Sequence, residues 1–566
     1  MGNMLDLVIR AGTVIDGTGG TPRTADVAVR EGRVVEVGKV TEPAGRVVDA
    51  DGALVTPGFV DIHTHYDGQV TWDSRIQPSS GHGVTTVVMG NCGVGFAPVR
   101  PTDHAQLIEL MEGVEDIPGA ALHEGLLWDW DSIPEYLDAV ERRPHDIDVA
   151  AQVCHGPLRL FVMGQRGADR KPATPDEIVE MGRLAAEGVR AGALGFTTSR
   201  TLNHRTSRGE PTPTLTAARE ELVGIARALG EVGSGVLQVV SDFPEFDTEM
   251  ETLLEMMRLS HRPLSVSLSQ GRTGVGHRHI LAAIAAANNE GLQMRAQVPA
   301  RGIGVLIGLQ GSVNPLRGSE TYRALEGLAL PELVATLSDA ALRTRILREL
   351  PQGVGILDRV FELVDPPDYE PAPEDSLAAR AARAGTPAEE LFFELLLGDG
   401  GKALLYWPIL NYFDGNLDAA AELLADPNAV PGLSDGGAHV GTICDASFPT
   451  TLLSYWCRDR TKGVRFVPEW IVSRQCRATA EAVGLLDRGI IAPGFKADLN
   501  VIDFERLGVA KPRLVFDLPA GGKRLLQQSF GYLHTFVSGV EVATDGESTG
   551  ETPGQLVRGA QAMPAH

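Results

Sequence analysis

Residues 55–68 read VTPGFVDIHTHYDG, an apolar, β-prone run that ends in an aspartate and two histidines. The run predicts a buried strand with His63 and His65 near its end. Because side chains alternate along a strand, both imidazoles of a His-x-His sequence lie on one face. At the end of a barrel strand that face is the mouth, where two imidazoles can hold one divalent metal ion. The alternative is that the two histidines lie in a surface loop, or lie in the core with their hydrogen bonds satisfied by protein groups. The β-rich segment that precedes them disfavours this alternative.

Beyond residue 68, strand-like runs alternate with helical stretches over most of the chain. The strand-like runs are GVTTVVMGNCG, DIDVAAQVCHG, GALGFTTSR, SGVLQVVSD, PLSVSLSQG, GLQMRAQVPARG and PNAVPGLSDGG. Helical periodicity is found in PDEIVEMGRLAAEGVRA, LTAAREELVGIARALGEVG and HILAAIAAANNEG. Such alternation predicts parallel strands joined by crossovers, and eight repeats close a (β/α)8 TIM-like barrel of the α/β class.

Short β-like segments with Gly and Asp turns flank this region on both sides. Residues 1–55 and 488–550 are therefore expected to form one composite β-sandwich beside a barrel of residues 56–487. Residues 311–400 interrupt the alternation of strand-like and helical stretches and include the linker VDPPDYEPAPEDS. We therefore expect an insertion that covers the site. Residues 551–566 are expected to be a loosely held tail.

Charge and composition exclude several classes of protein. The chain has 566 residues and a formal charge of -24, without a basic stripe that could neutralise phosphates, so no nucleic acid is expected. No run of 18 apolar residues occurs, so no membrane association is expected. Five widely spaced cysteines fit a reducing cytoplasm rather than a disulfide scaffold. We expect a cytoplasmic protein that acts on a small molecule, and the sequence leaves open whether it forms a homo-oligomer.

Several motifs resemble the amidohydrolase superfamily, and within it the N-acyl-D-amino-acid deacylase family. MGNCGVGFAPVRP (89–101) is similar to the second-strand motif of that family, and CHGPLR (154–159) to its Gly-His-x-x-Leu-Arg segment. GALGFTTSR resembles the strand-four motif, and LSDGGAHVG (433–441) resembles the aspartate motif of the last strand. LDRGIIAPGFKADLNVIDFERL resembles the return into the β-sandwich. The resemblance covers nearly the whole chain and implies a metal-dependent hydrolase with a barrel of the amidohydrolase type.

The resemblance implies four metal ligands, which are His63, His65, Cys92 and Asp435. Cys92 takes the place of the carboxylated lysine or glutamate of many relatives, and a thiolate suits Zn²⁺. Asp435 matches the aspartate that accepts a proton from the attacking water and then protonates the leaving nitrogen. The alternatives are a buried small cysteine and an aspartate that caps a helix or makes an Asx-turn.

The chain departs from the family at strands five and six, which normally add two histidines. The corresponding stretches GVLQVVSDF (235–243) and PLSVSLSQG (263–271) contain none. One zinc ion per chain is therefore favoured, and two would need His277 and His279 to fold back into the site. His261 precedes its strand and is expected at the wrong end of the barrel.

Other polar residues near the expected mouth are candidates for binding substrate. His155 and Arg159 are favoured because the family motif carries them, and an arginine fork suits a carboxylate. The remaining candidates are Arg200, Arg272, Arg301 and His439.

The expected reaction is hydrolysis of a linear amide in an N-acyl-D-amino acid or a related acylated compound. Hydrolysis of a cyclic amide or imide, as in hydantoinase- and dihydroorotase-like relatives, is the second hypothesis. The lack of lysine at position 92 weighs against it. A non-catalytic homologue with a degraded metal site is the third, and the presence of all four expected ligands weighs against that.

Overall fold

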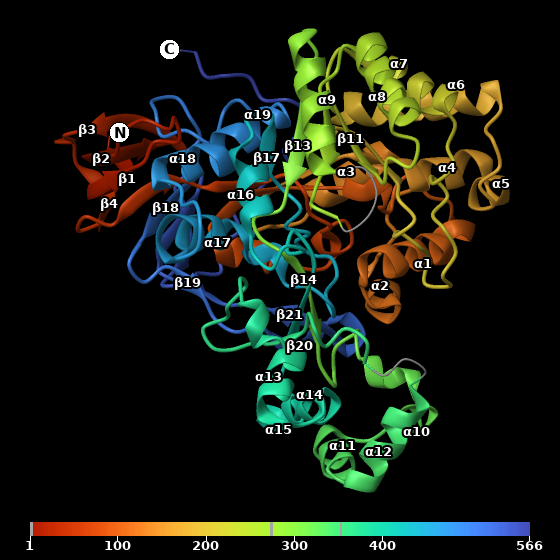
Figure 1. The fold of residues 1–566 in the computed structure, drawn as a ribbon. Coiled ribbons are helices and arrows are strands. Elements are labelled where there is room, and N and C mark those ends of the chain that lie inside the picture. Colours follow the sequence, from red (N-terminus) through yellow and green to blue (C-terminus); the bar gives the residue numbers. More distant parts are fainter. Residues whose placement is uncertain (1–3, 272–275, 351–353, 566) are drawn as a thin grey trace.

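The computed structural model describes residues 4–271, 276–350 and 354–565 (Figure 1). Its centre is a ring of eight parallel strands, which confirms the predicted barrel. The strands in order are β6 (Phe59–Asp61), β7 (Val84–Met89), β8 (Asp148–Ala151) with its continuation β9 (Val153–Cys154), β10 (Gly195–Arg200), β11 (Val236–Ser241), β12 (Leu264–Ser267), β13 (Met294–Val298) and β17 (Ala429–Pro431).

The barrel closes just beyond the ends of the first and last strands. Thr64, after β6, forms a parallel bridge with Gly436, after β17. The backbone N–H of Asp435 donates to the His63 carbonyl at 3.2 Å, and that of His65 donates to the Gly436 carbonyl at 2.7 Å. Closure therefore places the segment that carries Asp435 against the His-x-His segment.

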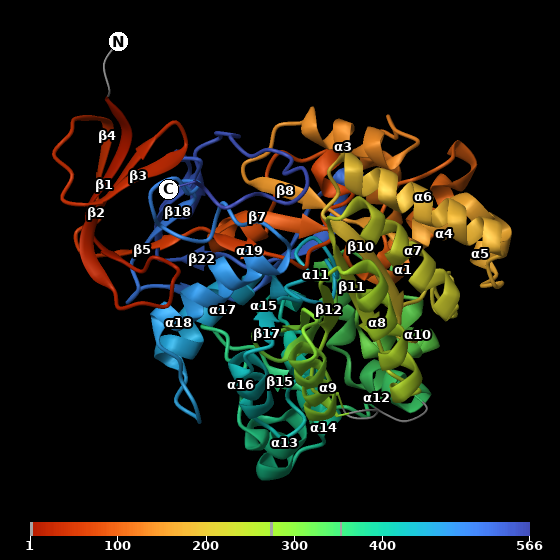
Figure 2. The ribbon, with the colours of Figure 1, turned by 90° about the horizontal axis from the view of Figure 1, so that it is seen from above.

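Helices surround the barrel, as the predicted crossovers require (Figure 2). The outer helices include α6 (Pro175–Ala191), α7 (Arg219–Val232), α8 (Phe246–Ser260), α9 (His277–Asn289) and α16 (Asp418–Ala425). Helix α6 begins where the sequence predicts, with Pro175 in its first turn and a capping box between Thr174 and Glu177. None of the helices within the described residues is long and apolar enough to cross a membrane.

One β-sheet takes strands from both ends of the chain, which agrees with the predicted β-rich domain beside the barrel. Strand β5 (Leu54–Pro57) pairs with β18 (Leu499–Ile502) in an antiparallel register. Figure 1 shows these red and blue segments side by side. The sheet also contains β1 (Leu5–Val14), β2 (Arg23–Arg30), β3 (Arg33–Gly38), β4 (Ala44–Asp49), β23 (Tyr532–Val537), β24 (Val540–Thr544) and β25 (Glu547–Ser548).

The insertion leaves the barrel from the carboxyl end of β13 and forms a unit with its own apolar core (Figure 1). Its sheet consists of β14 (Ile303–Ile307), β15 (Phe361–Glu362) and β16 (Leu405–Leu410), so it is wider than the expected residues 311–400. Its helices include α11 (Leu330–Leu337), α12 (Ala340–Glu349) and α14 (Ala388–Leu396). Two hydrogen bonds of 3.0 Å from Arg460 to the carboxylate of Glu370 tie it to the barrel.

The expectation of a loose tail over residues 551–566 is wrong. Gly554 bridges to His145, Leu556 bridges to Val149 of β8, and Leu556 is buried. The segment has no strand periodicity of its own, and its bridges to His145 and Val149 join residues that are 409 and 407 positions apart in the chain. Local sequence patterns carry no signal for such long-range pairing.

Candidate metal centre

Four side chains from three separate segments meet at the mouth of the barrel. One ligand atom from each of His63, His65 and Cys92 lies within 4.8 Å of the others, and all three residues are buried. The Nε2 of His63 lies 3.4 Å from Cys92 Sγ and 3.4 Å from Asp435 Oδ1. The Nε2 of His65 lies 3.8 Å from the same oxygen. The structure thus brings together the four residues for which the sequence predicts a metal.

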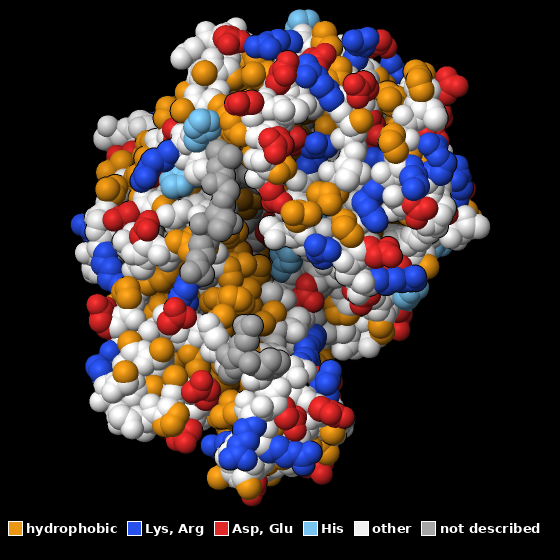
Figure 3. Space-filling view, turned by 45° about the vertical axis from the view of Figure 1, so that its right-hand side comes forward, with side chains coloured by type: hydrophobic (Ala, Val, Ile, Leu, Met, Phe, Trp, Pro, Cys, Tyr) orange, Lys and Arg blue, Asp and Glu red, His pale blue; other side chains and the backbone are white. Residues whose placement is uncertain are grey.

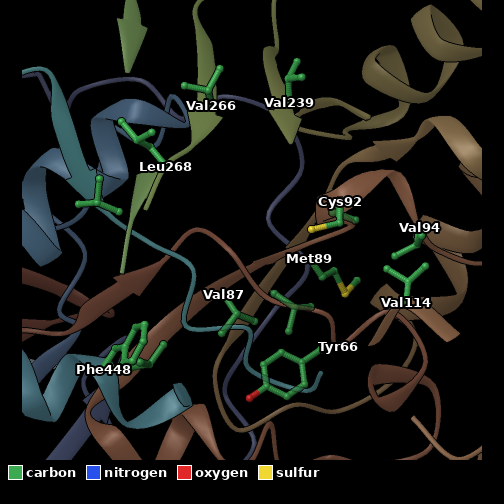
Figure 4. Packing of buried hydrophobic residues seen from close by; sticks show 14 of the residues in the cluster. Tyr66, Val87, Met89, Cys92, Val94, Val114, Val239, Val266, Leu268 and Phe448 are labelled. Carbon is green, nitrogen blue, oxygen red and sulfur yellow. The ribbon is translucent and has the colours of Figure 1, made fainter. Parts of the chain in front are cut away.

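Cys92 reaches the cluster through a tight turn directly after β7. Its φ is 56°, a left-handed conformation that is uncommon outside glycine, and Gly90 and Gly93 beside it have φ values of 83° and 69°. A Cβ atom on Gly90 would lie 2.7 Å from the Gln152 carbonyl oxygen, so only glycine lets the turn approach strand three. In Figure 4 the sulfur of Cys92 points from the end of β7 into the centre of the barrel.

Asp435 and His439 lie in the loop that follows β17. Both have left-handed backbones, with φ values of 49° and 50°. The Nε2 of His439 lies 4.0 Å from Asp435 Oδ2, and its side chain is 23% exposed, so it reaches the accessible side of the cluster. Figure 3 shows a hollow between the insertion and the barrel helices, bordered by hydrophobic side chains, with a histidine and an acidic side chain nearby.

The protonation of His63 is fixed by its surroundings. Burial lowers its pKa to about 4, so the ring is neutral near pH 7. Its Nδ1 lies 2.7 Å from Gln297 Oε1, an oxygen that can only accept, so Nδ1 carries the proton. Gln297 in turn donates to Ser265 Oγ at 2.9 Å, which fixes the orientation of the amide. The Nε2 lone pair is therefore free to bind a metal.

Carboxyl groups gather around this cluster. Burial raises the pKa values of Asp61 and Asp67 to about 7, and it raises that of Glu115 well above its usual range. Burial alone would also raise the pKa of Asp435, but the imidazoles of His65, His63 and His439 outweigh it and hold that pKa well below its usual range. Carboxyl groups buried together without an ammonium or guanidinium partner favour a bound cation.

The donor set and its spacing fit zinc. Two imidazoles, a thiol and a carboxylate are common zinc ligands, and bonds of about 2.0–2.3 Å in a tetrahedron place donors about 3.3–3.8 Å apart. The separations of 3.4, 3.4 and 3.8 Å match that spacing. Nε2 of His65 is buried without a hydrogen-bond partner, as expected of a nitrogen that binds a metal ion.

Three residues of the site are absent from the sequence prediction, namely Gln297, Glu115 and His204. Gln297 orients His63, and Glu115 Oε1 lies 3.3 Å from His65 Nδ1. Desolvation, followed by the charges of His439 and His65, lowers the pKa of His204 to about 3, so this residue is close enough to the cluster to interact with it electrostatically. Its Nδ1 is held 2.8 Å from Ser199 Oγ, at the end of β10. No motif marks the irregular loop that carries His204.

His277 and His279, which a second metal ion would need, have other partners in the structure. His277 lies 3.6 Å from Glu422, and the His279 ring packs against Phe246 with centroids 4.3 Å apart. His261 follows the last residue of α8, at the opposite end of the barrel from the site. Within the described part of the chain, the cluster of His63, His65 and Cys92 is the one group of three that could hold an ion.

The structure corrects the expectation that His155 and Arg159 bind substrate. Both are buried and share the carboxylate of Glu221, with His155 Nε2 at 2.8 Å and Arg159 at 3.4 Å from Oε1. His155 also contacts Thr198 Oγ1 at 2.8 Å, so both ring nitrogens have internal partners.

The other arginine candidates are also not brought to the cluster. Arg200 pairs with Glu249 at 2.6 Å. Arg301 is buried, pairs with Asp445 at 2.9 Å and stacks 3.6 Å above the Tyr369 ring. Arg272 lies outside the described residues. Of the substrate-binding candidates within the described residues, His439 alone lies beside the four expected ligands.

Comparisons with known proteins agree with this geometry. An uncharacterised protein of Mycobacterium tuberculosis is 28% identical over 541 residues, which cover 88% of this chain and 84% of that protein. The D-aminoacylase of Alcaligenes xylosoxydans xylosoxydans is 32% identical over 229 residues, which cover 40% of this chain and 43% of that enzyme. The crystal structure of the N-acyl-D-glutamate deacylase of Bordetella bronchiseptica, complexed with zinc and a phosphonate inhibitor, is 25% identical, with a TM-score of 0.65 over 98% of this chain and 100% of that chain. The family model described as "Amidohydrolase family" matches residues 46–543, and the chain therefore belongs to the amidohydrolase family.

Proposed function

We propose that this protein is a zinc-dependent hydrolase that cleaves the linear amide bond of an N-acyl-D-amino acid or a related acylated compound. The observation that carries the proposal is the cluster of His63, His65 and Cys92. Asp435 Oδ1 lies beside it, 3.4 Å from Nε2 of His63 and 3.8 Å from Nε2 of His65. The resemblance to D-aminoacylase and to N-acyl-D-glutamate deacylase supports the carbon–nitrogen bond as the target.

The four side chains have two different roles in this proposal, metal binding and proton transfer. A bound zinc ion would make water acidic near neutral pH and would polarise the amide carbonyl. His63, His65 and Cys92 would hold the ion, and binding would require the Cys92 thiol to lose its proton, because burial raises its pKa well above the usual range. Asp435 is ionised because its pKa is low, so its carboxylate can accept a proton from water and pass it to the leaving nitrogen.

One zinc ion per chain is the stoichiometry that the donors support. Strands β11 and β12 contain no histidine, and the described residues offer no second cluster of three ligands. The cysteines are free thiols, four of them buried, which supports a reducing cytoplasm.

Hydrolysis of a cyclic amide is the competing reaction, and a substrate panel separates the two. The zinc-loaded protein is offered N-acetyl-D- and N-acetyl-L-amino acids, hydantoin and dihydrouracil, and release of the amine or opening of the ring is measured. We expect release from the N-acetyl-D-amino acids. Ring opening without any release would instead favour the cyclic-amide reaction, and a protein that binds no zinc and turns over nothing would be a degraded homologue.

Asp435→Asn tests the proposed base. We expect kcat to fall by about 10²–10⁴-fold, the usual contribution of a positioned acid–base group, while the fold is retained. Asp176→Asn, in the exposed first turn of α6, is the matched control and should keep the wild-type rate. An Asp435→Asn variant with undiminished kcat would remove this residue from the mechanism.

A further inference from the structure

Glu115 lies between two histidines of the site although no motif includes it. It is the last residue of α1 (His104–Glu115), and its side chain is 1% exposed. Its Oε1 lies 3.3 Å from Nδ1 of His65, and its Oε2 lies 3.6 Å from Nε2 of His439. One buried carboxylate thus faces both an expected metal ligand and the histidine on the accessible side of the cluster.

The backbone around Glu115 holds the loop that carries Asp435 and His439. The N–H of His439 donates to the Glu115 carbonyl. The carboxylate of Asp116 accepts from the Gly441 N–H at 3.2 Å and from the Thr442 hydroxyl. The loop is therefore held at residues 439–442 by the end of α1, in addition to its backbone hydrogen bonds with His63 and His65.

In both His63 and His65, Nδ1 faces a side-chain oxygen of another element. Nδ1 of His63 faces the amide oxygen of Gln297 on β13, and Nδ1 of His65 faces the carboxylate of Glu115 on α1. In both rings Nε2 is the nitrogen directed toward Asp435. His65 Nδ1 and Glu115 Oε1 form no hydrogen bond in the structure, but at 3.3 Å a small rotation of either side chain would make one. An acceptor at Nδ1 fixes the tautomer and the ring orientation of a histidine that binds metal through Nε2.

We propose that Glu115 is a positioning residue that fixes His65 for metal binding through Nε2 and holds His439 beside Asp435. The proposal rests on the proposed zinc-dependent function. It assigns to the last residue of α1 a role that the sequence does not indicate.

The test compares zinc binding by the wild type and three full-length variants. Glu115→Met keeps the length of the side chain but removes both oxygens, and Glu115→Gln keeps one acceptor oxygen. Glu109→Gln, on the same helix and paired with the exposed Arg208, is the matched control. Zinc dissociation constants come from competition with a chelator, kcat and KM come from steady-state kinetics, and the melting temperature of the zinc-free protein reports the fold.

We expect the zinc dissociation constant to rise about 10–100-fold in Glu115→Met and by less in Glu115→Gln, because loss of an outer partner typically has that effect. The kcat value should fall more than KM rises, and Glu109→Gln should match the wild type. If both Glu115 variants bind zinc and turn over like the wild type, Glu115 has no positioning role. If only the melting temperature of the zinc-free protein changes, the residue is structural and the proposal is wrong. A wild type that binds no zinc overturns the proposed function itself, so the two failures are distinguishable.

Discussion

Cys92 is the proposed ligand whose replacement tests for the metal most directly. Serine differs from it by one atom, so Cys92→Ser leaves the turn intact but replaces a soft thiolate ligand by a poor one. We expect zinc affinity to fall by more than about 100-fold, because a lost ligand costs more than the 10–100-fold typical of an outer partner. Zinc content measured by mass spectrometry and activity should fall together.

The pH dependence of zinc binding adds a second measurement for Cys92. Burial raises the pKa of the thiol well above its usual range, so zinc must displace a proton, and wild-type affinity should increase as pH rises. The slope should be shallower in Cys92→Ser, which has no thiol to deprotonate there. Cys476→Ser is the control, since this buried sulfur lies 3.6 Å from the Pro57 carbonyl, outside the cluster. Equal zinc content and equal slopes in the two variants would exclude Cys92 as a ligand.

At the residue scale, the sequence indicates the proposed ligands, which follow strands, and misses the site residues that lie elsewhere. His63, Cys92 and Asp435 lie in segments that directly follow predicted strands, where barrel geometry brings residues together. Glu115 lies at the end of a helix, and its only local signal is its spacing of four and eight residues from the buried Met111 and Leu107. An acidic residue on the buried face of a helix is the signal that could have indicated it.

At the scale of elements, the strands of the barrel are predictable because they are buried on both faces. Strand β7 is buried at every position, and the sequence there, VTTVVM, is rich in β-branched residues. The amphipathic helix α6 is predicted with its exact bounds because proline and a capping box mark its start. The tail and the start of the insertion are not predictable, because their partners lie far away in the chain.

Helices α4 (His155–Met163) and α7 are joined by an ion pair that the sequence suggested as a substrate contact. Arg159→Leu would leave the buried carboxylate of Glu221 with His155 alone. Breaking a buried pair in this way costs about 3–5 kcal/mol, so we expect a marked loss of stability in denaturant unfolding. The KM of the folded variant should change by less than about twofold, because the guanidinium is buried away from the mouth.

Arg183→Leu provides the comparison for this prediction. Arg183 pairs with Glu180 on the exposed face of α6, so its loss should cost only about 0.2–1 kcal/mol. A tenfold rise in KM for Arg159→Leu without loss of stability would restore the substrate-binding role.

At the scale of the whole molecule, the barrel brings together segments more than 370 residues apart. The buried carboxyl groups gathered there include Asp435 and Glu115, whose ion-pair partners are histidines, so a bound cation should stabilise the fold. Asp435 pairs through its backbone with His63, and Ser434 bonds to Asp61. An ion bound only by the folded state adds about 4 kcal/mol when free zinc exceeds the dissociation constant 1,000-fold. For a chain of this length that corresponds to a rise in melting temperature of about 3–4 °C. Calorimetry of chelator-treated protein with and without added zinc should show this rise, and Cys92→Ser should show little of it. Equal melting temperatures for the zinc-free and zinc-loaded wild type would mean that the four side chains do not form a zinc site.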